Sequence, residues 1–446
     1  MLREFDLSYQ AKTLEQFESN PYPNIPIEVS PKNNLKLLYE NSLVTARYRR
    51  DKTVITDLKS RVMLDVACGT GATTLTMALA NPGATIIGVD ISPESIRIAE
   101  ERLEYHGFSN VTFQVLAIEE LEKLDTKFDY ISASDVLYLL PDLSVALQQL
   151  GKVLKSDGII RSNLHSYYQR LSYFRCQELF RYMGLMENNP GNTEMEFVQE
   201  FFTILKDGVD LKIRAWDSTM YPPDKTSLLS NHLLMNDKGF TIPQLLNSLE
   251  SAGLELISMV DWRKWDWREL FKDPDNLPAY LALGLESADM TEQLAFYELL
   301  EPNKRLLDFW CGHPQTLSNK VTPDWQTIDL SMERIYLHPC LKSEAFQQSV
   351  FNAQSLTPLN LGDFFNFLVK DAWLDRTLVS ILFISLFTAP CFLGDLVDRW
   401  LQVQPVNPVT LEPWQREMVV QLLRSAVADQ EALGILLVAV ENSPES

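Results

Sequence analysis

Residues 62–78 read VMLDVACGTGATTLTMA. An apolar run typical of a buried strand is followed by Gly69 and Gly71, which bracket one threonine, and then by residues that favour a helix. In an open parallel sheet, ligands bind at the carboxyl ends of the strands. A glycine turn there lets the backbone approach a ligand and directs helix N–H groups towards it. The stretch predicts a ligand site after the first strand; a tight turn without a ligand is the alternative.

Strand-like and helix-like runs alternate from about residue 60 to residue 163. The expected strands are RVMLDVA, ATIIGVD, VTFQVLA, FDYISAS and GIIRSNL, and the expected helices between them are GATTLTMALA, PESIRIAEERLEYHG and LSVALQQLGKVLK. This alternation indicates an α/β fold with a doubly wound parallel sheet. The run GFTIPQLLNSLESAGLELISMVD (239–261) predicts a further helix and strand that complete the second edge. Residues 164–238 are therefore expected to be an insertion.

The rest of the chain divides into an arm and a C-terminal domain. Residues 1–50 include NPYPNIPIEVSP (20–31), whose prolines forbid regular helix and predict an arm laid across a domain. The α/β domain is expected over residues 51–265. Beyond it, aromatic residues and helical runs predict a separate, mainly helical domain over residues 266–446, with a small sheet around TIDLSMERIYLHP.

Charge and apolar content narrow the classes of partner. The chain has 39 basic and 60 acidic side chains among 446 residues, a formal net charge of −21, so a broad nucleic-acid surface is disfavoured. The N-terminus lacks the apolar core of a signal peptide, and the most apolar run, TLVSILFISLF, is too short to span a bilayer. Five scattered cysteines fit a reducing compartment. We expect a cytoplasmic protein without membrane contact; its oligomeric state is not indicated.

An acid after the second expected strand indicates the kind of ligand. Asp90, in IIGVDIS, follows the glycine turn by about twenty residues, where a carboxylate can accept hydrogen bonds from ribose hydroxyls. Thr74 stands where a dinucleotide fingerprint has its third glycine, and no phosphate-binding G-x-x-x-x-G-K-[ST] motif occurs. The pattern predicts a ribose-bearing cofactor and disfavours a nicotinamide dinucleotide.

Four ordered segments carry a family resemblance: LDVACGTG, VDIS, FDYISASDVLYLLPD and VLKSDGIIRSN. They resemble the motifs of class I S-adenosylmethionine-dependent methyltransferases over roughly residues 60–163. The resemblance implies a Rossmann-like, seven-stranded methyltransferase sheet, S-adenosyl-L-methionine as cofactor and methyl transfer as activity. The whole chain also resembles a bacterial, largely uncharacterised group with a Pro-rich arm, an LVTARYRR run and C-terminal motifs such as NKRLLDFWCGHP and YLHPCL. Its layout is more faintly similar to bacterial protein-lysine methyltransferases.

The resemblance assigns the cofactor-binding residues. It implies that Gly69 and Gly71 let the methionine part pass over the backbone, that Asp65 orients the loop and the cofactor's amino group, and that Asp90 holds the ribose. At the third strand the family's usual acid is replaced by Ala117, which leaves Glu119 or a backbone carbonyl to contact the adenine amino group. The predicted cofactor-binding set is Asp65, Gly69, Thr70, Gly71, Asp90, Ile91, Ile118, Glu119 and Ser134.

The acceptor of the methyl group is not indicated by the sequence, because methyl transfer depends mainly on positioning and exclusion of water. No N-P-P-Y-type motif follows the fourth strand; Ser134-Asp135-Val136-Leu137 stands there. Asp135 and Tyr138 are the candidate catalytic residues, although Asp135 alternatively caps the next turn. His165 is a further candidate base, with a structural histidine as the favoured interpretation. A protein or small-molecule acceptor is favoured over nucleic acid, and a non-catalytic cofactor-binding or scaffold protein stays the alternative function.

Two other groups of residues could carry chemistry. Cys311 with His313 and His338 with Cys340 could form a zinc site, but neither spacing is a usual zinc motif, so no metal is expected. Arg47, in the basic run before the first strand, could pair with the cofactor's carboxylate while the arm closes over the site, or it could belong to a solvated basic patch.

Overall fold

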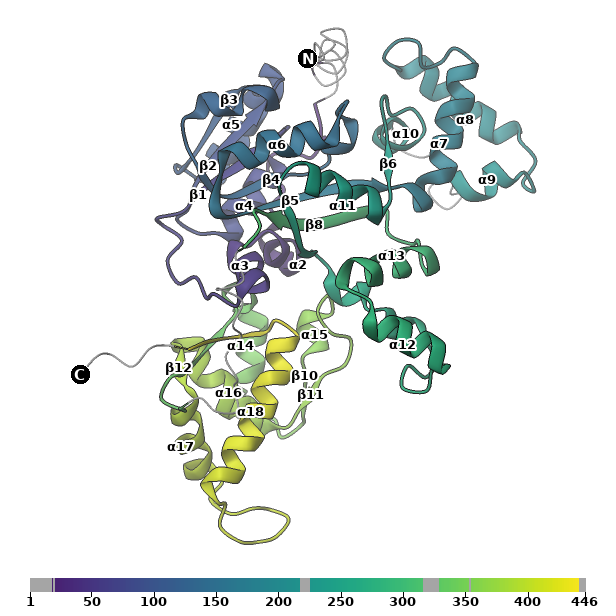
Figure 1. The fold of residues 1–446 in the computed structure, drawn as a ribbon. Coiled ribbons are helices and arrows are strands. Elements are labelled where there is room, and N and C mark those ends of the chain that lie inside the picture. The colour runs from purple at the N-terminus through teal and green to yellow at the C-terminus, as the bar shows by residue number, and fades with distance from the viewer. Residues whose placement is uncertain (1–17, 19–20, 217–224, 316–328, 353, 441–446) are drawn as a thin grey trace. The chain divides into compact units, whose positions relative to one another are not determined.

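The computed structural model describes residues 18, 21–216, 225–315, 329–352 and 354–440 (Figure 1). The chain forms two compact units. The first contains Met1–Val29, Ser60–Leu75 and Ala84–Pro314, and the second contains Ser30–Lys59, Thr76–Gly83 and Gln315–Ser446.

The first unit is built on a sheet of seven strands in the order β3-β2-β1-β4-β5-β8-β7, with the short β6 beside β5. Strands β1 to β5 run parallel, and β8 runs antiparallel to both β5 and β7. This arrangement confirms the predicted doubly wound, Rossmann-like sheet. The strands are β1 (Val62–Val66), β2 (Thr85–Asp90), β3 (Val111–Val115), β4 (Phe128–Ala133), β5 (Leu154–Ser166), β6 (Gly239–Phe240), β7 (Glu255–Met259) and β8 (Leu306–Gly312).

Strand β8 lies where the sequence did not place it. Its residues LLDFWCG were assigned to a C-terminal domain over residues 266–446, yet they pair between β5 and β7 in the first unit. Phe309 and Trp310 are fully buried. A strand covered on both faces lacks the polar–apolar alternation that marks a half-exposed strand, so its aromatic run gave no strand signal. The boundary of the first unit therefore differs from the predicted 51–265.

Helices at the expected positions connect the strands of the first unit. Ser92, Asp142 and Thr241 cap α5, α6 and α11 by accepting hydrogen bonds from backbone N–H groups of the first turn. The helices are α4 (Ala72–Ala80), α5 (Pro93–Tyr105), α6 (Leu143–Val153), α11 (Ile242–Ser251), α12 (Ala279–Ser287) and α13 (Met290–Leu300), with the 3₁₀ turns η2 (Ile118–Leu124), η3 (Leu137–Leu139), η5 (Trp262–Trp265) and η6 (Trp267–Leu270).

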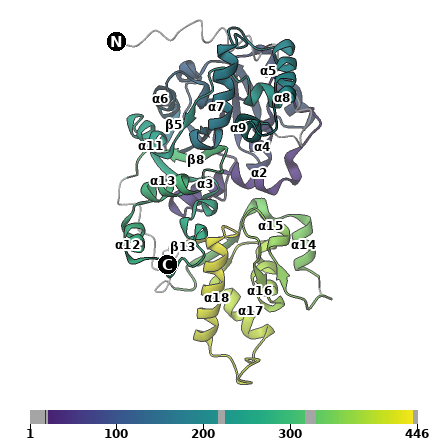
Figure 2. The ribbon, with the colours of Figure 1, turned by 90° about the vertical axis from the view of Figure 1, so that its right-hand side faces the viewer.

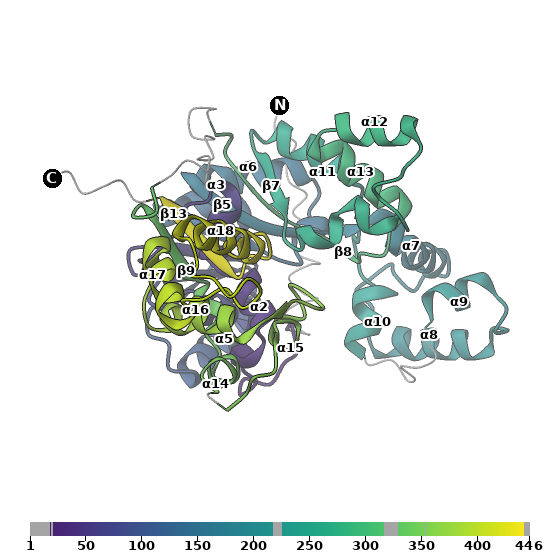
Figure 3. The same ribbon diagram turned by 90° about the horizontal axis from the view of Figure 1, so that it is seen from below.

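The predicted insertion over residues 164–238 begins later than expected, because residues 164–166 complete β5. From Tyr167 onwards its described part is helical and has a small core of its own. Phe180, Val198 and Phe202 are fully buried within it. Figure 3 shows α8, α9 and α10 lying together beyond the end of α7. The helices of this segment are α7 (Tyr167–Tyr182), α8 (Asn192–Ile204), α9 (Asp210–Ala215) and α10 (Lys225–Asn231).

The second unit is mainly helical, as expected for the C-terminal half. It contains the small antiparallel sheet β12-β9-β13, whose strand β9 lies in the run where a sheet was expected. Figure 2 shows α16, α17 and α18 packed side by side. The strands are β9 (Glu333–Leu337), β10 (Leu359–Asn360), β11 (Trp373–Leu374), β12 (Cys391–Phe392) and β13 (Leu436–Val440); the helices are α14 (Glu344–Val350), α15 (Gly362–Phe365), α16 (Arg376–Thr388), α17 (Leu393–Val403) and α18 (Arg416–Ala432), with η8 (Pro339–Leu341).

The most apolar run of the chain forms α16, whose Ile381, Leu382 and Phe383 are fully buried within the second unit. Within the described residues, every helix is too short or too polar to cross a membrane.

The segment before β1 is not one continuous arm. Residues 30–51 form η1 (Pro31–Asn33), α2 (Leu35–Glu40) and α3 (Leu43–Asp51), which belong to the second unit. The Tyr48 hydroxyl donates to Glu431 Oε1 at 2.6 Å, and Arg47 forms an ion pair with Asp51. Only the described residues up to Val29 belong to the first unit, so the predicted arm of residues 1–50 is divided between the two units.

Candidate functional site

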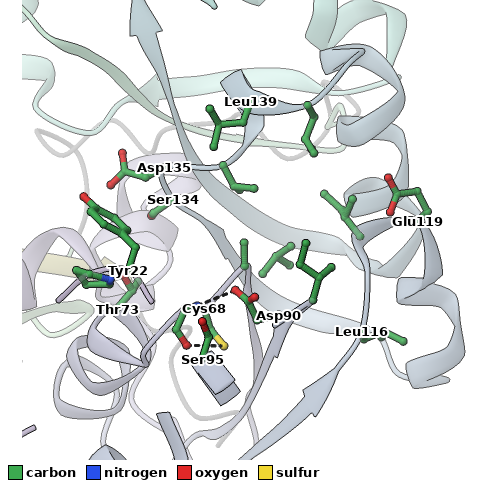
Figure 4. Close-up of a pocket in the computed structure, with 18 residues that line it drawn as sticks. Tyr22, Cys68, Thr73, Asp90, Ser95, Leu116, Glu119, Ser134, Asp135 and Leu139 are labelled. Atoms are coloured by element: carbon green, nitrogen blue, oxygen red, sulfur yellow. Dashed lines mark hydrogen bonds between the residues drawn. The ribbon is translucent and has the colours of Figure 1, made fainter. Parts of the chain in front are cut away.

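A pocket opens at the carboxyl ends of β1, β2 and β4 in the first unit (Figure 4). Among the predicted cofactor-binding residues, its lining includes Gly69, Asp90, Ile91, Ile118, Glu119 and Ser134. The predicted residues that do not line it are Asp65, Thr70 and Gly71. Of the two candidate catalytic residues, Asp135 lines the pocket and Tyr138 does not. The topology therefore brings most of the predicted set together at one edge of the sheet.

The lining residues follow one another in a fixed order across the pocket. Figure 4 shows Leu116 and Glu119 at one end, and Tyr22, Ser134 and Asp135 at the other, with Asp90 between them. The pocket can thus receive an elongated ligand whose central part forms hydrogen bonds with Asp90.

Asp90 connects the glycine loop to the start of α5. Its Oδ2 accepts from the Gly69 N–H and its Oδ1 accepts from the Ser92 N–H, both at 2.9 Å. Burial raises the pKa of the Asp90 carboxyl, while the hydrogen bonds from Ser92 and Gly69 oppose this shift. A carboxylate can accept about four hydrogen bonds, so both oxygens keep capacity for a ligand hydroxyl.

The N–H groups of the glycine loop are already used within the protein. Besides the Gly69 N–H, the Thr70 N–H donates to the Tyr22 carbonyl oxygen at 3.1 Å and the Gly71 N–H donates to the Cys68 carbonyl oxygen at 3.0 Å. The N–H groups of residues 69–71 are therefore engaged within the protein, whereas the expectation about the N–H groups of the following helix stays a prediction. A pyrophosphate would need such donors, so the loop fits a cofactor without phosphate better than a dinucleotide.

Gly69 and Gly71 occupy positions where a side chain would clash with neighbouring atoms. Both have positive φ angles, 50° at Gly69 and 79° at Gly71. A Cβ on Gly69 would lie 2.1 Å from the Tyr22 carbonyl oxygen, and a Cβ on Gly71 would lie 2.9 Å from the Cβ of Ala99 in α5. The atoms closest to these positions thus belong to the arm and to α5. This reason differs from the expected passage of a methionine chain over the backbone.

Replacing Gly69 by alanine is expected to displace the arm. An alanine at this position would have to adopt a left-handed backbone conformation, and its Cβ would clash with the Tyr22 carbonyl oxygen. A shift of this carbonyl would disturb its hydrogen bond from the Thr70 N–H. Gly107→Ala is the matched control, because Gly107 also has a positive φ (77°) and a Cβ there would have no neighbour within 4 Å. The control should cost about 1–2 kcal/mol of unfolding free energy from backbone strain alone.

Denaturant unfolding and limited proteolysis measure the difference between the two variants. Gly69→Ala should lose more unfolding free energy than Gly107→Ala and should be cleaved faster in residues 21–29. Equal losses with an equally protected arm would show that the contact with Tyr22 is unimportant.

Asp65 lies beneath the loop, not in the pocket lining. It is buried, and its Oδ2 accepts from the Thr74 hydroxyl at 2.6 Å. Burial raises the pKa of the Asp65 carboxyl to about 7, against the opposing hydrogen bonds from Thr74 and Ser132. Asp65 therefore ties β1 to α4 and holds the loop between them, whereas its predicted contact with the cofactor's amino group stays a prediction.

Asp135 occupies the other end of the pocket in a strained backbone conformation. Its φ is 56°, and its N–H donates to Asn163 Oδ1 at 3.0 Å. Its Oδ1 is buried and has no hydrogen-bond partner among the described residues. Burial raises the pKa of the Asp135 carboxyl, while the charge of Arg305 opposes this shift. Strain and an unpaired buried oxygen are features that concentrate at functional sites.

Tyr138 and His165 form a layer behind the pocket. Their rings stack with centroids 3.8 Å apart, and both side chains are buried. His165 Nδ1 lies 2.6 Å from Asp237 Oδ1, and its Nε2 faces the Arg305 guanidinium at 3.5 Å. Burial lowers the pKa of His165 to about 4. A neutral, fully buried imidazole with both nitrogens engaged favours the structural interpretation of His165.

The four residues weighed for zinc are divided between the units. Cys311 and His313 belong to the first unit, and His338 and Cys340 belong to the second. His338 Nδ1 accepts from the Cys340 N–H, and its Nε2 lies 2.9 Å from the Thr45 hydroxyl. Among the described residues, no three His, Cys, Asp or Glu side chains are grouped so that they could hold a metal ion.

Sequence reasoning missed several residues around the pocket. Tyr22, Cys68, Thr73, Val136, Leu139 and Leu140 also line it. Val136, Leu139 and Leu140 follow β4 directly and could have been found from the topology. Tyr22 is in the Pro-rich arm, where no periodic pattern indicated which side chain faces the site.

The comparisons with known proteins agree with this geometry. A family model described as "Methyltransferase domain" matches residues 57–212. Over these residues the chain matches a methyltransferase domain. The fold class and the recognition of this family are confirmed, and S-adenosylmethionine, the predicted cofactor, is the methyl donor of such domains.

The curated relatives match parts of the chain. A malonyl-[acyl-carrier protein] O-methyltransferase of Acetivibrio thermocellus is 39% identical over 105 residues, which are 23% of this chain and 36% of the relative. An uncharacterized protein of Synechococcus sp. is 24% identical over 252 residues, 56% of this chain and 60% of the relative. The chain thus spans less than two thirds of the length of these relatives.

A solved structure resembles the chain over most of its length. PKMT2 from Rickettsia typhi has a TM-score of 0.56 and 15% sequence identity, with 91% of this chain and 75% of that chain covered. At this identity the likeness concerns the fold alone, and it extends beyond the methyltransferase domain into the C-terminal half.

Proposed function

We propose that this chain binds S-adenosylmethionine in the pocket and transfers its methyl group to an N–H or O–H group of a protein or a small metabolite. The observation that carries the proposal is the order of the lining residues: Asp90 lies between the end of the pocket at Leu116 and Glu119 and the end at Asp135. An adenosine with a methionine chain has its ribose in the middle, which fits this order.

The residues present suit each part of that cofactor. Ile91, Leu116 and Ile118 offer apolar surface for an adenine ring, with Glu119 at the same end. The spare acceptor capacity of Asp90 suits two ribose hydroxyls. The loop offers no free N–H at positions 69–71, and S-adenosylmethionine has no phosphate that would need one.

The chemistry at the far end follows from Asp135. When bound, S-adenosylmethionine would supply an electrophilic methyl group on its sulfonium, which a lone pair of the acceptor would displace while the carbon–sulfur electron pair stays with sulfur. The Asp135 carboxylate, which belongs to the pocket lining, would accept a hydrogen bond from the N–H or O–H of the methyl acceptor and then take its proton. Val136, Leu139 and Leu140 give this end an apolar wall that excludes water.

The same residues favour an enzyme over a non-catalytic cofactor-binding or scaffold protein. Cofactor binding alone does not require a strained Asp135 with an unsatisfied buried oxygen, because such a group costs stability. A hydrogen bond from the group that receives the methyl would satisfy the Asp135 carboxylate.

Calorimetry and radiolabelling test the proposal. The wild-type chain should bind S-adenosylhomocysteine and S-adenosylmethionine and should not bind NAD. Incubation with methyl-labelled cofactor and fractionated lysate should then move label into protein or small molecules. Binding of NAD without binding of S-adenosylhomocysteine would contradict the cofactor, whereas binding without any label transfer would favour the scaffold alternative.

A further inference from the structure

The described part of the N-terminal arm is fixed across the cofactor loop by backbone contacts. The Thr70 N–H donates to the Tyr22 carbonyl oxygen at 3.1 Å, and the Thr70 hydroxyl donates to the Pro23 carbonyl oxygen at 2.8 Å. These bonds pair two successive arm carbonyls with one residue of the glycine loop. The position of Tyr22 is therefore set by the loop itself.

Arg102 of α5 fixes the following arm residues to the same loop. Its guanidinium donates to the carbonyl oxygens of Thr70 at 2.8 Å, Pro26 at 3.0 Å and Ile25 at 2.7 Å. The Arg102 side chain is 1% exposed, and the charge of Glu28 in the arm acts on its guanidinium. Through these three hydrogen bonds the buried guanidinium connects the arm, the glycine loop and α5.

This anchoring places the Tyr22 side chain at the polar end of the pocket. Figure 4 shows its ring extending towards Asp135, with the hydroxyl on the side of the Asp135 carboxylate. Tyr22 is 36% exposed, so it lies at the mouth of the pocket and not in its depth. Burial raises the pKa of the Tyr22 hydroxyl, and the charge of Asp135 raises it further. The phenol is thus protonated, and its oxygen keeps lone pairs that can accept a hydrogen bond from an N–H group.

We infer that Tyr22 is an acceptor-side residue of the site, whose hydroxyl, together with Asp135, holds the N–H or O–H group that receives the methyl. The inference rests on the proposed function. The acceptor group can donate one hydrogen bond to the Asp135 carboxylate, which lines the pocket. The Tyr22 hydroxyl oxygen accepts a second hydrogen bond where the acceptor is an amine, and the Tyr22 hydroxyl donates to the spare lone pair where the acceptor is an alcohol. One lone pair of the acceptor thus stays free to bond to the methyl group. The arm then supplies a functional group of the reaction as well as a wall. Arg102 is a positioning residue that acts through the backbone of the arm.

A pair of cofactor analogues tests this inference without a known acceptor. Sinefungin carries a C–NH₃⁺ group where S-adenosylmethionine carries the sulfonium methyl, whereas S-adenosylhomocysteine has nothing at that position. The ratio of their dissociation constants therefore reports on groups that face the transferred methyl. Calorimetry would measure both ligands against the wild type, Tyr22→Phe, Asp135→Asn and the double variant. Tyr280→Phe, which removes the hydroxyl of a 93% exposed tyrosine, is the matched control.

We expect Tyr22→Phe to weaken sinefungin binding about tenfold, because a hydrogen bond to a charged ligand group is lost, with S-adenosylhomocysteine binding within about twofold of wild type. The double variant should lose less than the sum of the single variants, because both residues act on one group. Tyr280→Phe should change neither constant.

The remaining outcomes separate the inference from the function on which it rests. An unchanged ratio in Tyr22→Phe, or an equal loss for both ligands, would overturn the role of Tyr22. Failure of the wild type to bind S-adenosylhomocysteine at all would instead overturn the proposed function.

Discussion

Asp135→Asn is expected to reduce label transfer at least about 100-fold while S-adenosylhomocysteine still binds within about threefold of wild type, because a positioned base contributes roughly 10²–10⁴-fold. The amide keeps the size of the carboxyl group and one acceptor oxygen, but it cannot take a proton from the acceptor. Single-turnover transfer to the labelled fraction measures the rate, and calorimetry measures the affinity. Asp275→Asn, which changes an exposed aspartate in the same unit, is the control.

The pH dependence of transfer gives a second readout for Asp135. Its pKa is raised by burial, so the carboxyl takes up a proton at a higher pH than an ordinary aspartate does. A protonated carboxyl cannot accept the acceptor's proton, and the wild-type rate should fall as the pH drops through this raised pKa. Asp135→Asn should lack this fall. A full transfer rate in the variant, or the same pH profile in both proteins, would remove Asp135 from the mechanism.

The sheet and one side of the site could be predicted because topology determines them. Once the strands at residues 62–66, 85–90 and 128–133 are recognised, a parallel sheet must bring their carboxyl ends together. Asp90 is the last residue of its strand and Asp135 comes two residues after the end of another, so their positions in the chain were enough to place them in one pocket. The apolar wall after β4 follows from the same rule.

Tyr22 and β8 could not be predicted, for two different reasons. The arm is held by carbonyl oxygens of Tyr22, Pro23, Ile25 and Pro26, and a backbone carbonyl carries no sequence signal. Strand β8 is buried between β5 and β7, so its aromatic residues lack the alternation that indicates a strand. The division of residues 1–50 between two units depends likewise on tertiary contacts, such as that of Tyr48 with Glu431.

The hydrogen bonds of Asp90 give this residue two roles that one variant removes together. Asp90→Ala deletes the acceptor for the Gly69 and Ser92 N–H groups as well as the expected acceptor for the ribose hydroxyls. Loss of a charge-assisted hydrogen bond costs about 1.5–3 kcal/mol, and 1.4 kcal/mol corresponds to about tenfold in affinity. Affinity for S-adenosylhomocysteine should therefore fall at least about tenfold, whichever role dominates.

A second ligand separates the two roles of Asp90. An S-adenosylhomocysteine analogue without the two ribose hydroxyls should bind the wild type about tenfold more weakly than S-adenosylhomocysteine does, since it offers no donor to the carboxylate. In Asp90→Ala the two ligands should bind with similar affinity, because the partner of the hydroxyls is gone. Glu100→Ala, an exposed acid on α5, should leave both affinities and their ratio as in the wild type. If Asp90→Ala weakens both ligands equally and keeps their ratio, Asp90 only holds the loop, and the ribose must be bound by another group.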